Sequence, residues 1–373
     1  MKTVKVLLVG AGGYAKNYVQ ALLCMHDDAV VFSAVADPCL ATSGLQQQFV
    51  EHGVAQYGFP CQAYTEHQFD LVIISSPIHT HYAYIVEALE HGCNVLCEKP
   101  VVLDERQLAD LQRRQKESGL FIAVGFQQCF DRGLLALKQD VLSGMFGKPV
   151  RLKALRFMRR GDAYYQRNNW AGRIMVEGQP IYDSPVSNAC AHQLQTMLFL
   201  LGASLTDSAG IRQVEGFRYR ARPTLETYDA AALRITTTQE VPLLYYTGHC
   251  VQEKQVGPIG EFEFEKGRIV LDGDGFTAMF GDGTVKRYAE EGQNPTMHKL
   301  MDALSCTRDH EKPVCTVDGV ASHTAVVLAA HQLPLIPCNA RYDLIEGDGT
   351  YVVPALMERC LKAYEAWSLD DAR

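Results

Sequence analysis

Short apolar runs alternate with amphipathic segments over the first 125 residues. Segments with apolar residues three or four positions apart predict helices at 13–25, 80–91 and 104–117, the last with Asp104 as its N-cap. The apolar runs around these helices predict buried strands at 4–9, 30–36, 70–75, 94–97 and 120–124. Strands that alternate with helices predict a doubly wound parallel sheet, which binds ligands at the carboxyl ends of its strands.

The pattern changes beyond residue 125. Residues 149–160 alternate apolar and polar positions, and 210–288 contain several such runs separated by glycine turns. This alternation predicts a large open, mostly antiparallel sheet with one solvated or interface face. Helical spacing is found at 184–201, 296–305, 318–333 and 352–368. We therefore expect an α/β protein with a doubly wound domain at 1–125 and an α+β domain at 126–373, whose tail at 335–373 could pack back on the first domain.

Composition narrows the class of partner. The chain of 373 residues carries a net charge of −8, so no global field attracts nucleic acid or an anionic membrane. Its twelve cysteines form no CxxC pair and no zinc-spaced cluster with histidine, which predicts no metal site and indicates a reducing compartment. No stretch is long enough to span a bilayer, and the apolar run at 4–9 is too short for a signal peptide. We expect a cytoplasmic protein.

Arginines alternate with other residues in two places, Arg156 with Arg160 and Arg218 with Arg220 and Arg222. This spacing indicates the solvated or interface faces of strands rather than a polybasic patch. The alternative is that some of these side chains hold an anionic substrate.

A glycine-rich segment, Gly10-Ala11-Gly12-Gly13-Tyr14-Ala15, fits the pattern G-x-G-x-x-A between the first strand and the first helix. The first glycine permits a tight turn, the second lets the backbone approach a pyrophosphate, and Ala15 lets the helix pack close to the sheet. The helix N-terminus then faces the phosphates with free N–H groups. Asp37, which ends the second strand, can accept hydrogen bonds from the adenosine ribose and would repel a 2′-phosphate. We predict a Rossmann domain that binds NAD in preference to NADP; the alternatives are an unrelated glycine turn and a simple turn residue at Asp37.

Two further groups are candidates for chemistry. Lys99, in Glu98-Lys99-Pro100, follows a buried strand and so lies at the ligand edge, where its ammonium could hydrogen-bond a substrate oxygen. A solvated loop lysine is the alternative. Asn188 and His192 are four positions apart and share a face if they lie on a helix, where the histidine could transfer a proton. A histidine satisfied within the core is the alternative.

Together these segments resemble the Gfo/Idh/MocA oxidoreductase family, to about residue 335. The matching segments are VLLVGAGGYA at 6–15, VADP at 35–38, SSPIHTH at 75–81, ALEHGCNVLCEKP at 88–100, GFQQCFDRGLLALKQDVLSGMFGKP at 125–149 and, more loosely, NACAHQLQTMLFLLG at 188–202. The resemblance implies NAD(P)-dependent redox chemistry on sugars, polyols and their derivatives. It also implies a C-terminal sheet that forms dimer contacts, and hence a homodimer or homotetramer.

The resemblance implies roles for individual residues. Lys99 corresponds to the family's catalytic lysine and His192 to its proton-transferring histidine. Positions that line the dinucleotide site in the family fall at Ser76, Pro77, His81, Glu98 and Gln127.

The chain departs from the family pattern D-x-G-x-H-x-x-D. Asn188, Cys190 and Gln195 stand where the family has Asp, Gly and Asp. Asn188 carries no charge that would raise the basicity of the histidine, although it can still orient the ring. Asp183 is nine residues before His192 and lies outside the family's spacing.

The segment 164–172 is dense in aromatic and amide groups, which predicts carbohydrate contacts for Tyr165 and Trp170; the alternative is that Trp170 fills the domain junction. The leading hypothesis is an NAD-dependent dehydrogenase or reductase of a sugar or polyol. In it Lys99 polarises the substrate oxygen and His192, oriented by Asn188, transfers the proton. Two alternatives stay open: an NAD-dependent glycosidase or lyase that oxidises its sugar transiently, and a dinucleotide-binding regulatory protein without catalysis.

Overall fold

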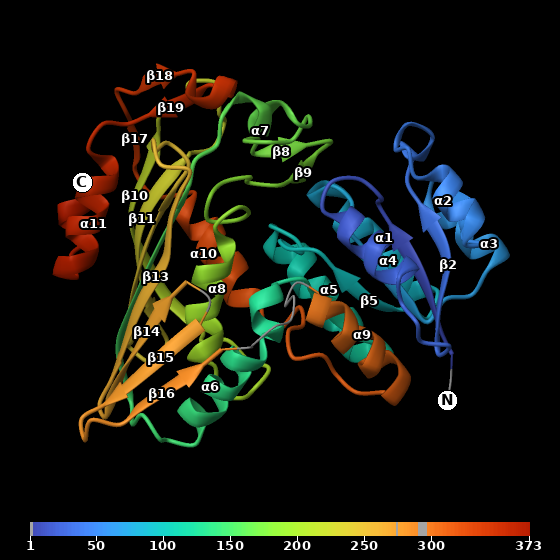
Figure 1. The fold of residues 1–373 in the computed structure, drawn as a ribbon, viewed down its shortest axis with the longest axis horizontal. Coiled ribbons are helices and arrows are strands. Elements are labelled where there is room, and N and C mark those ends of the chain that lie inside the picture. The colour runs from blue at the N-terminus through green and yellow to red at the C-terminus, as the bar shows by residue number, and fades with distance from the viewer. Residues whose placement is uncertain (1–2, 274, 290–296) are drawn as a thin grey trace. The chain divides into compact units, whose positions relative to one another are not determined.

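The computed structural model describes residues 3–273, 275–289 and 297–373 (Figure 1). The chain divides into two units. Unit 1 comprises Met1–Phe130 and Asn294–Asp318, and unit 2 comprises Asp131–Gln293 and Gly319–Arg373.

Unit 1 is built on a six-stranded sheet with the order β3-β2-β1-β4-β5-β6, in which every described pair of neighbours is parallel. Its strands are β1 (Val4–Val9), β2 (Val30–Ala36), β3 (Ala55–Tyr57), β4 (Leu71–Ile74), β5 (Asn94–Cys97) and β6 (Ile122–Val124). This order places the ends of β1 and β4 side by side, at the point where the strand order reverses. The predicted doubly wound sheet is therefore confirmed.

Six α-helices of unit 1 accompany this sheet: α1 (Ala15–Leu23), α2 (Gln46–Glu51), α3 (Pro60–Glu66), α4 (His81–Glu90), α5 (Glu105–Ser118) and α9 (His298–Asp309). Asp104 caps α5 as predicted, because its carboxylate accepts hydrogen bonds from the amides of Arg106 and Gln107 at 2.8 and 2.9 Å. Short 3-10 turns lie at η1 (Leu40–Thr42), η2 (Ile78–Thr80) and η3 (Gln127–Phe130).

The helix α9 comes from far along the chain but belongs to the core of unit 1. Leu300, Ala303 and Leu304 pack in one apolar cluster with residues of β1 such as Val6 and Leu8. The strand pairing continues beyond the helix, since the amide of Val317 donates to the carbonyl of Ile122 at 2.9 Å. The sequence pattern had placed the 296–305 segment, whose first residue lies outside the described residues, in the second domain; apolar burial instead assigns α9 to unit 1.

Unit 2 is built on a nine-stranded sheet with the order β16-β15-β14-β13-β7-β12-β11-β10-β17. Its strands are β7 (Pro149–Met158), β10 (Ile211–Arg220), β11 (Ala230–Thr237), β12 (Pro242–Gly248), β13 (Gln255–Phe264), β14 (Gly267–Asp272), β15 (Gly275–Phe280), β16 (Val285–Tyr288) and β17 (Leu335–Pro337). The pairs β7–β12 and β10–β17 are parallel, and the other pairs are antiparallel. Two small hairpins add β8 (Met175–Val176), β9 (Gln179–Pro180), β18 (Arg341–Asp343) and β19 (Thr350–Val352). The predicted large, mostly antiparallel sheet is confirmed.

Helices cover both faces of this sheet (Figure 1). The helices α6 (Arg132–Leu142), α8 (Ala191–Leu200) and α10 (Ala321–Ala330) lie on one face, and α11 (Leu356–Ala366) lies on the other. The short helix α7 (Asp162–Gln166) follows β7, while the 3-10 turns η5 (Ile345–Gly347) and η6 (Asp370–Ala372) lie in the C-terminal segment. None of the described helices is long and apolar enough to cross a membrane.

The C-terminal tail packs on the sheet of unit 2. Leu356 and Ala363 share an apolar cluster with Leu155 of β7 and Tyr246 of β12. The Tyr246 hydroxyl also donates to the carbonyl of Ser368 at 2.8 Å. The sequence left open that this tail packs back on the first domain; the apolar face of α11 is instead buried within unit 2.

Candidate functional site

The glycine-rich loop lies between β1 and α1 and needs glycine for two different reasons. At Gly10 φ is +92°, and a Cβ atom there would lie 2.7 Å from the carbonyl oxygen of Ser75. Gly10 is therefore required by the close approach of β1 and β4. At Gly12 no other atom lies within 4 Å of the position of a Cβ, so space is open beside the first turn of α1. This arrangement, together with the buried Ala15, has the geometry expected of a loop that binds a pyrophosphate.

Asp37 fastens this loop to the end of β2. Its Oδ2 accepts a hydrogen bond from the amide of Ala11 at 2.7 Å, and its Oδ1 accepts one from the amide of Cys39 at 2.7 Å. A carboxylate has about four lone-pair sites, so two such bonds leave capacity for a ribose hydroxyl. The turn role and the ribose role proposed for Asp37 are thus compatible.

The loops after β4 and β5 are joined through His81. This side chain is buried, and its Nδ1 lies 3.0 Å from the carbonyl oxygen of Pro100 while its Nε2 lies 3.0 Å from that of Ser76. Burial lowers the pKa of His81. The ring therefore holds the segments that contain Ser76, Pro77 and Lys99 rather than presenting a titrating surface group.

Glu98 is the centre of a buried polar network that the sequence did not reveal. Its Oε1 accepts a hydrogen bond from the Tyr18 hydroxyl at 2.7 Å and forms an ion pair with Lys299, whose side chain is fully buried. Its Oε2 lies 3.3 Å from the amide nitrogen of Lys99, which donates to it. Burial lowers the pKa of Lys299, and the charge of Glu98 opposes that shift. The network fixes the carboxylate next to the backbone of the candidate catalytic lysine.

Tyr14 and Gln127 meet beside this network. The Tyr14 hydroxyl donates to Oε1 of Gln127 at 3.2 Å, and the Lys299 ammonium lies 4.4 Å from the centroid of the Tyr14 ring. Burial and the charge of Glu98 raise the pKa of Tyr14, so its hydroxyl remains a donor at neutral pH. Two residues predicted on the dinucleotide site are therefore hydrogen-bonded to each other.

In unit 2, Asn188 is hydrogen-bonded to the carboxylate of Asp183, a residue that lies outside the family's sequence spacing. The Asn188 side-chain amide donates to Oδ1 of Asp183 at 2.8 Å, and the amide of Gly172 donates to Oδ2 at 2.7 Å. Asp183 is 3% exposed. Position 188 therefore has Asn where the family has Asp, but the carboxylate of Asp183, from the preceding turn, is hydrogen-bonded to that Asn.

The predicted helix at 184–201 begins later than expected. Asn188 lies in the turns before α8, which starts at Ala191, whereas His192 lies in its first turn. The helical spacing invoked for Asn188 and His192 is therefore wrong, because the backbone at 188 is not helical. Gln195, at the family's second Asp position, is buried and donates to the carbonyl of Gly319 at 3.1 Å.

The candidate substrate residues lie on and after α7. The Tyr165 hydroxyl lies 2.8 Å from Nδ1 of His249, a buried residue that the sequence did not single out. Trp170 is half-buried, with the Arg167 guanidinium 4.8 Å from its ring. Asp183 links this segment to Asn188 through the amide of Gly172.

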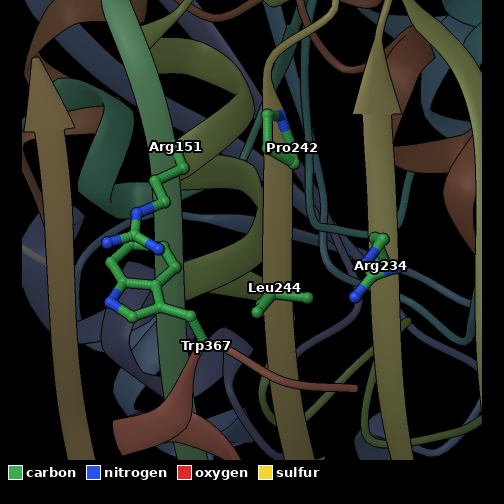
Figure 2. Close-up of a pocket in the computed structure, with 5 residues that line it drawn as sticks. All are labelled: Arg151, Arg234, Pro242, Leu244 and Trp367. Atoms are coloured by element: carbon green, nitrogen blue, oxygen red, sulfur yellow. The ribbon is translucent and has the colours of Figure 1, made fainter. Parts of the chain in front are cut away.

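A separate cavity of about 300 Å³ lies on the sheet of unit 2 (Figure 2). It is lined by Arg151, Arg234, Pro242, Leu244 and Trp367. The Arg151 guanidinium stacks 3.9 Å from the Trp367 ring centroid. The residues that line it include none of those predicted from the sequence to bind a cofactor or substrate.

The strand order and the glycine loop define a dinucleotide-binding protein of the Rossmann type. The model of the oxidoreductase family with an NAD-binding Rossmann fold, Gfo/Idh/MocA, matches residues 4–126. The match covers the N-terminal region that forms the parallel sheet of unit 1.

Curated relatives resemble part of the chain. Inositol 2-dehydrogenase from Burkholderia ambifaria is 24% identical over 214 residues, which are 55% of this chain and 57% of the relative. The NAD(+)-dependent scyllo-inositol 2-dehydrogenase from Bacillus subtilis is 27% identical over 55% of each chain. The chain thus matches little more than half the length of these relatives.

Solved structures resemble more of the chain. The WlbA dehydrogenase from Bordetella pertussis, in complex with NADH and UDP-GlcNAcA, aligns with a TM-score of 0.71. The alignment covers 89% of this chain and 97% of that chain at 17% identity. At this identity the likeness establishes the two-part fold.

Proposed function

We propose that this protein is an NAD(P)-dependent oxidoreductase that acts on a CH–OH group of a sugar, polyol or sugar derivative, with NAD as the preferred cofactor. The observation that carries the proposal is the arrangement at the strand ends of unit 1. Three features occur there: open space beside Gly12, the Asp37 carboxylate hydrogen-bonded to the glycine-rich loop, and Lys99, whose amide donates to Glu98. Glu98 is itself held by its ion pair with Lys299. The inositol dehydrogenases among the relatives support the substrate class.

The residues of unit 1 suit the cofactor. The backbone N–H groups of the glycine-rich loop before α1 would hold the pyrophosphate, and Asp37 would accept hydrogen bonds from the ribose hydroxyls. When bound, the nicotinamide ring accepts or gives the hydride. Tyr14, Ser76, Pro77 and Gln127 would line its site, with His81 and Glu98 holding the loops in place.

Three residues would handle the substrate oxygen and its proton. Lys99 donates a hydrogen bond to the oxygen and stabilises the negative charge that develops there during oxidation. His192 takes the hydroxyl proton, and returns it when the reaction runs as a reduction. Asn188 orients the histidine, and Asp183 holds Asn188 through the 2.8 Å hydrogen bond. Tyr165 and Trp170 contact the sugar.

The test is a comparison of Lys99→Met with Lys116→Met, an exposed lysine on α5. Turnover is followed by NADH absorbance over a panel of sugars, inositols and sugar acids, and NAD binding by calorimetry. Lys99→Met should lower turnover by about 100-fold or more while NAD binding is retained, because its ammonium acts on the transition state. Lys116→Met should change neither quantity. Unchanged turnover in Lys99→Met would contradict the assignment.

The same panel separates the alternatives. A glycosidase or lyase that oxidises its sugar transiently would form product with no net change in NADH. A regulatory protein would bind NAD and turn over no substrate. We also propose a homodimer or homotetramer through unit 2, which light scattering with multi-angle detection tests; a monomer at micromolar concentration would contradict it.

A further inference from the structure

A group of cationic and aromatic side chains surrounds His249, which follows β12 in unit 2. We call Arg160, Tyr164, Tyr165, Arg167 and Arg222 the arginine–tyrosine cluster. The amide of Arg160 donates to the carbonyl of His249 at 3.2 Å, and the Tyr164 ring centroid lies 5.5 Å from that of His249. Arg222 lies 4.7 Å from the Tyr165 ring. The guanidinium groups of three arginines therefore lie over the rings of two adjacent tyrosines.

Two of the arginines stack on the same ring. The Arg167 guanidinium lies 3.7 Å from the Tyr164 ring centroid and the Arg160 guanidinium 4.8 Å from it. Arg167 is exposed and Arg160 is half-buried, so both reach solvent. Stacking leaves the edges of a guanidinium, where its N–H groups lie, available to an acceptor.

Neither of these two arginines forms an ion pair with a carboxylate in the part of the chain that the structure describes. Neighbouring arginines have carboxylate partners: Arg159 pairs with Glu346 at 2.9 Å and Arg222 with Asp162 at 2.5 Å. Arg160 and Arg167 have no ion pair with a described residue, and donate only to backbone carbonyls and a thioether. Like charges held together without anions repel one another, which an anionic ligand would relieve.

The buried part of the cluster also lacks hydrogen-bond acceptors. The Nε of Arg160, an Nη of Arg222 and the Nε2 of His249 are buried without a partner among the described residues. The Tyr165 hydroxyl lies 2.8 Å from Nδ1 of His249 and either donates to it or accepts from it, depending on the tautomer of the ring. The two unpartnered guanidinium nitrogens, on Arg160 and Arg222, are donors in either case. Clustered donors without acceptors indicate a ligand rich in oxygen acceptors.

The cluster is connected to the predicted proton-transfer residues within unit 2. Gly172, at the end of the segment that carries Arg167, donates its amide to Asp183, which in turn accepts from Asn188. Tyr164 and Asn188 thus belong to neighbouring segments tied by one carboxylate.

We propose that the substrate carries an anionic group, a carboxylate or a phosphate, which binds to Arg160 and Arg167 over Tyr164. The inference rests on the proposed function and narrows its substrate from sugars and polyols in general to their acidic or phosphorylated derivatives. Arginine pairs with such groups through two parallel hydrogen bonds, and a charged acceptor strengthens each of them. Tyr164 holds the two guanidinium groups in place for that contact.

The first experiment measures kcat/KM for matched substrates: glucose, glucuronate and glucose 6-phosphate, and inositol with inositol 1-phosphate. The wild type should prefer a charged member of a set by about 10-fold or more, and the preferred member identifies carboxylate or phosphate as the group bound. Arg160→Gln combined with Arg167→Gln should lower kcat/KM for that member by about 10-fold to 100-fold and leave the neutral sugar within about twofold. Arg173→Gln, which breaks a surface pair with Glu226, is the matched control and should change neither value.

A second measurement keeps the two proposals separable. Binding of glucuronate and glucose 6-phosphate is measured by calorimetry, with and without NAD, in the wild type and the double variant. If no substrate turns over but an anion binds the wild type and not the double variant, the oxidoreductase proposal fails and the anion site stands. If neutral sugars are preferred, or if the double variant binds and turns over the charged sugars as the wild type does, the anion site is refuted.

Discussion

A cationic side chain in unit 1 and two in unit 2 differ in whether they have a carboxylate partner. In unit 1 the Lys299 ammonium contacts the Glu98 carboxylate, and the Tyr18 hydroxyl completes the set. In unit 2, Arg160 and Arg167 lie over Tyr164 without a described carboxylate partner. A neutral network of buried charges holds a loop in one geometry, whereas a cation without an ion-pair partner is available to a ligand. The comparison teaches that a cation paired with a carboxylate supports the fold, whereas cations without such a partner can recognise an anionic ligand.

The largest expected effect comes from breaking the neutral network. Lys299→Met leaves the Glu98 carboxylate buried without its counter-ion, so the free energy of unfolding should fall by about 3–5 kcal/mol, measured by urea titration. Glu98→Gln in the same chain removes the unpaired charge and should recover at least half of that loss. A fall below about 1 kcal/mol in the single variant would show that the pair does not support unit 1.

An intermediate effect is expected from Asp229, which is buried beside the arginine–tyrosine cluster and accepts from the amides of Ala221 and Arg222. Burial raises the pKa of Asp229 to about 6 from 3.8. The folded state therefore retains a proton that the unfolded chain releases, so stability is lost as the pH rises from about 4 to about 6. Asp229→Asn cannot titrate, so its stability relative to the wild type should increase by about 2–3 kcal/mol over that window.

Urea titrations of both proteins at pH 4, 5, 6 and 7 check this expectation. The lost hydrogen bonds of the variant add a constant offset, so only the change with pH is informative. A stability difference that is flat between pH 4 and pH 7 would contradict the raised pKa of Asp229.

The smallest effect should separate ligand binding from folding in unit 1. Gly12→Ala adds a methyl group to open space, so the urea midpoint should stay the same while NAD binds about 10-fold more weakly, since the methyl meets the pyrophosphate. Gly10→Ala should instead lower the urea midpoint. At Gly10 φ is +92° and the added Cβ would clash with the backbone of Ser75, so the substitution destabilises the fold itself. Calorimetry with NAD and urea titration of both variants test the pair; NAD binding by Gly12→Ala at wild-type strength would refute the role of Gly12.

Features encoded in short segments could be predicted from the sequence. The strands β1, β4, β5 and β6 of unit 1 are mostly buried and form apolar runs in the sequence. The turn at Gly10 and the cap at Asp104 use residues whose local chemistry is specific. The strand β3 (Ala55–Tyr57) was missed because its three residues are half-buried and form no apolar run.

Features that depend on distant contacts could not be predicted. Lys299 is 201 positions from Glu98, and a single lysine on an amphipathic helix carries no signal of burial. Asp183 reaches Asn188 through a turn rather than through helical spacing, so periodicity could not pair them. The same holds for His249, which the fold brings to Tyr165 across 84 positions.

The placement of α9 has a consequence for synthesis. When the ribosome has completed the six strands of unit 1, the helix that packs on β1 and β4 has not yet been made, and the strands of the other unit must emerge first. Until α9 is synthesised, part of the apolar surface of the Rossmann sheet remains exposed. Exposed apolar surface of this kind is what chaperones bind on incomplete chains. An N-terminal fragment cut at residue 130 carries the motif that binds dinucleotides but lacks Leu300, Ala303 and Leu304 of its own core.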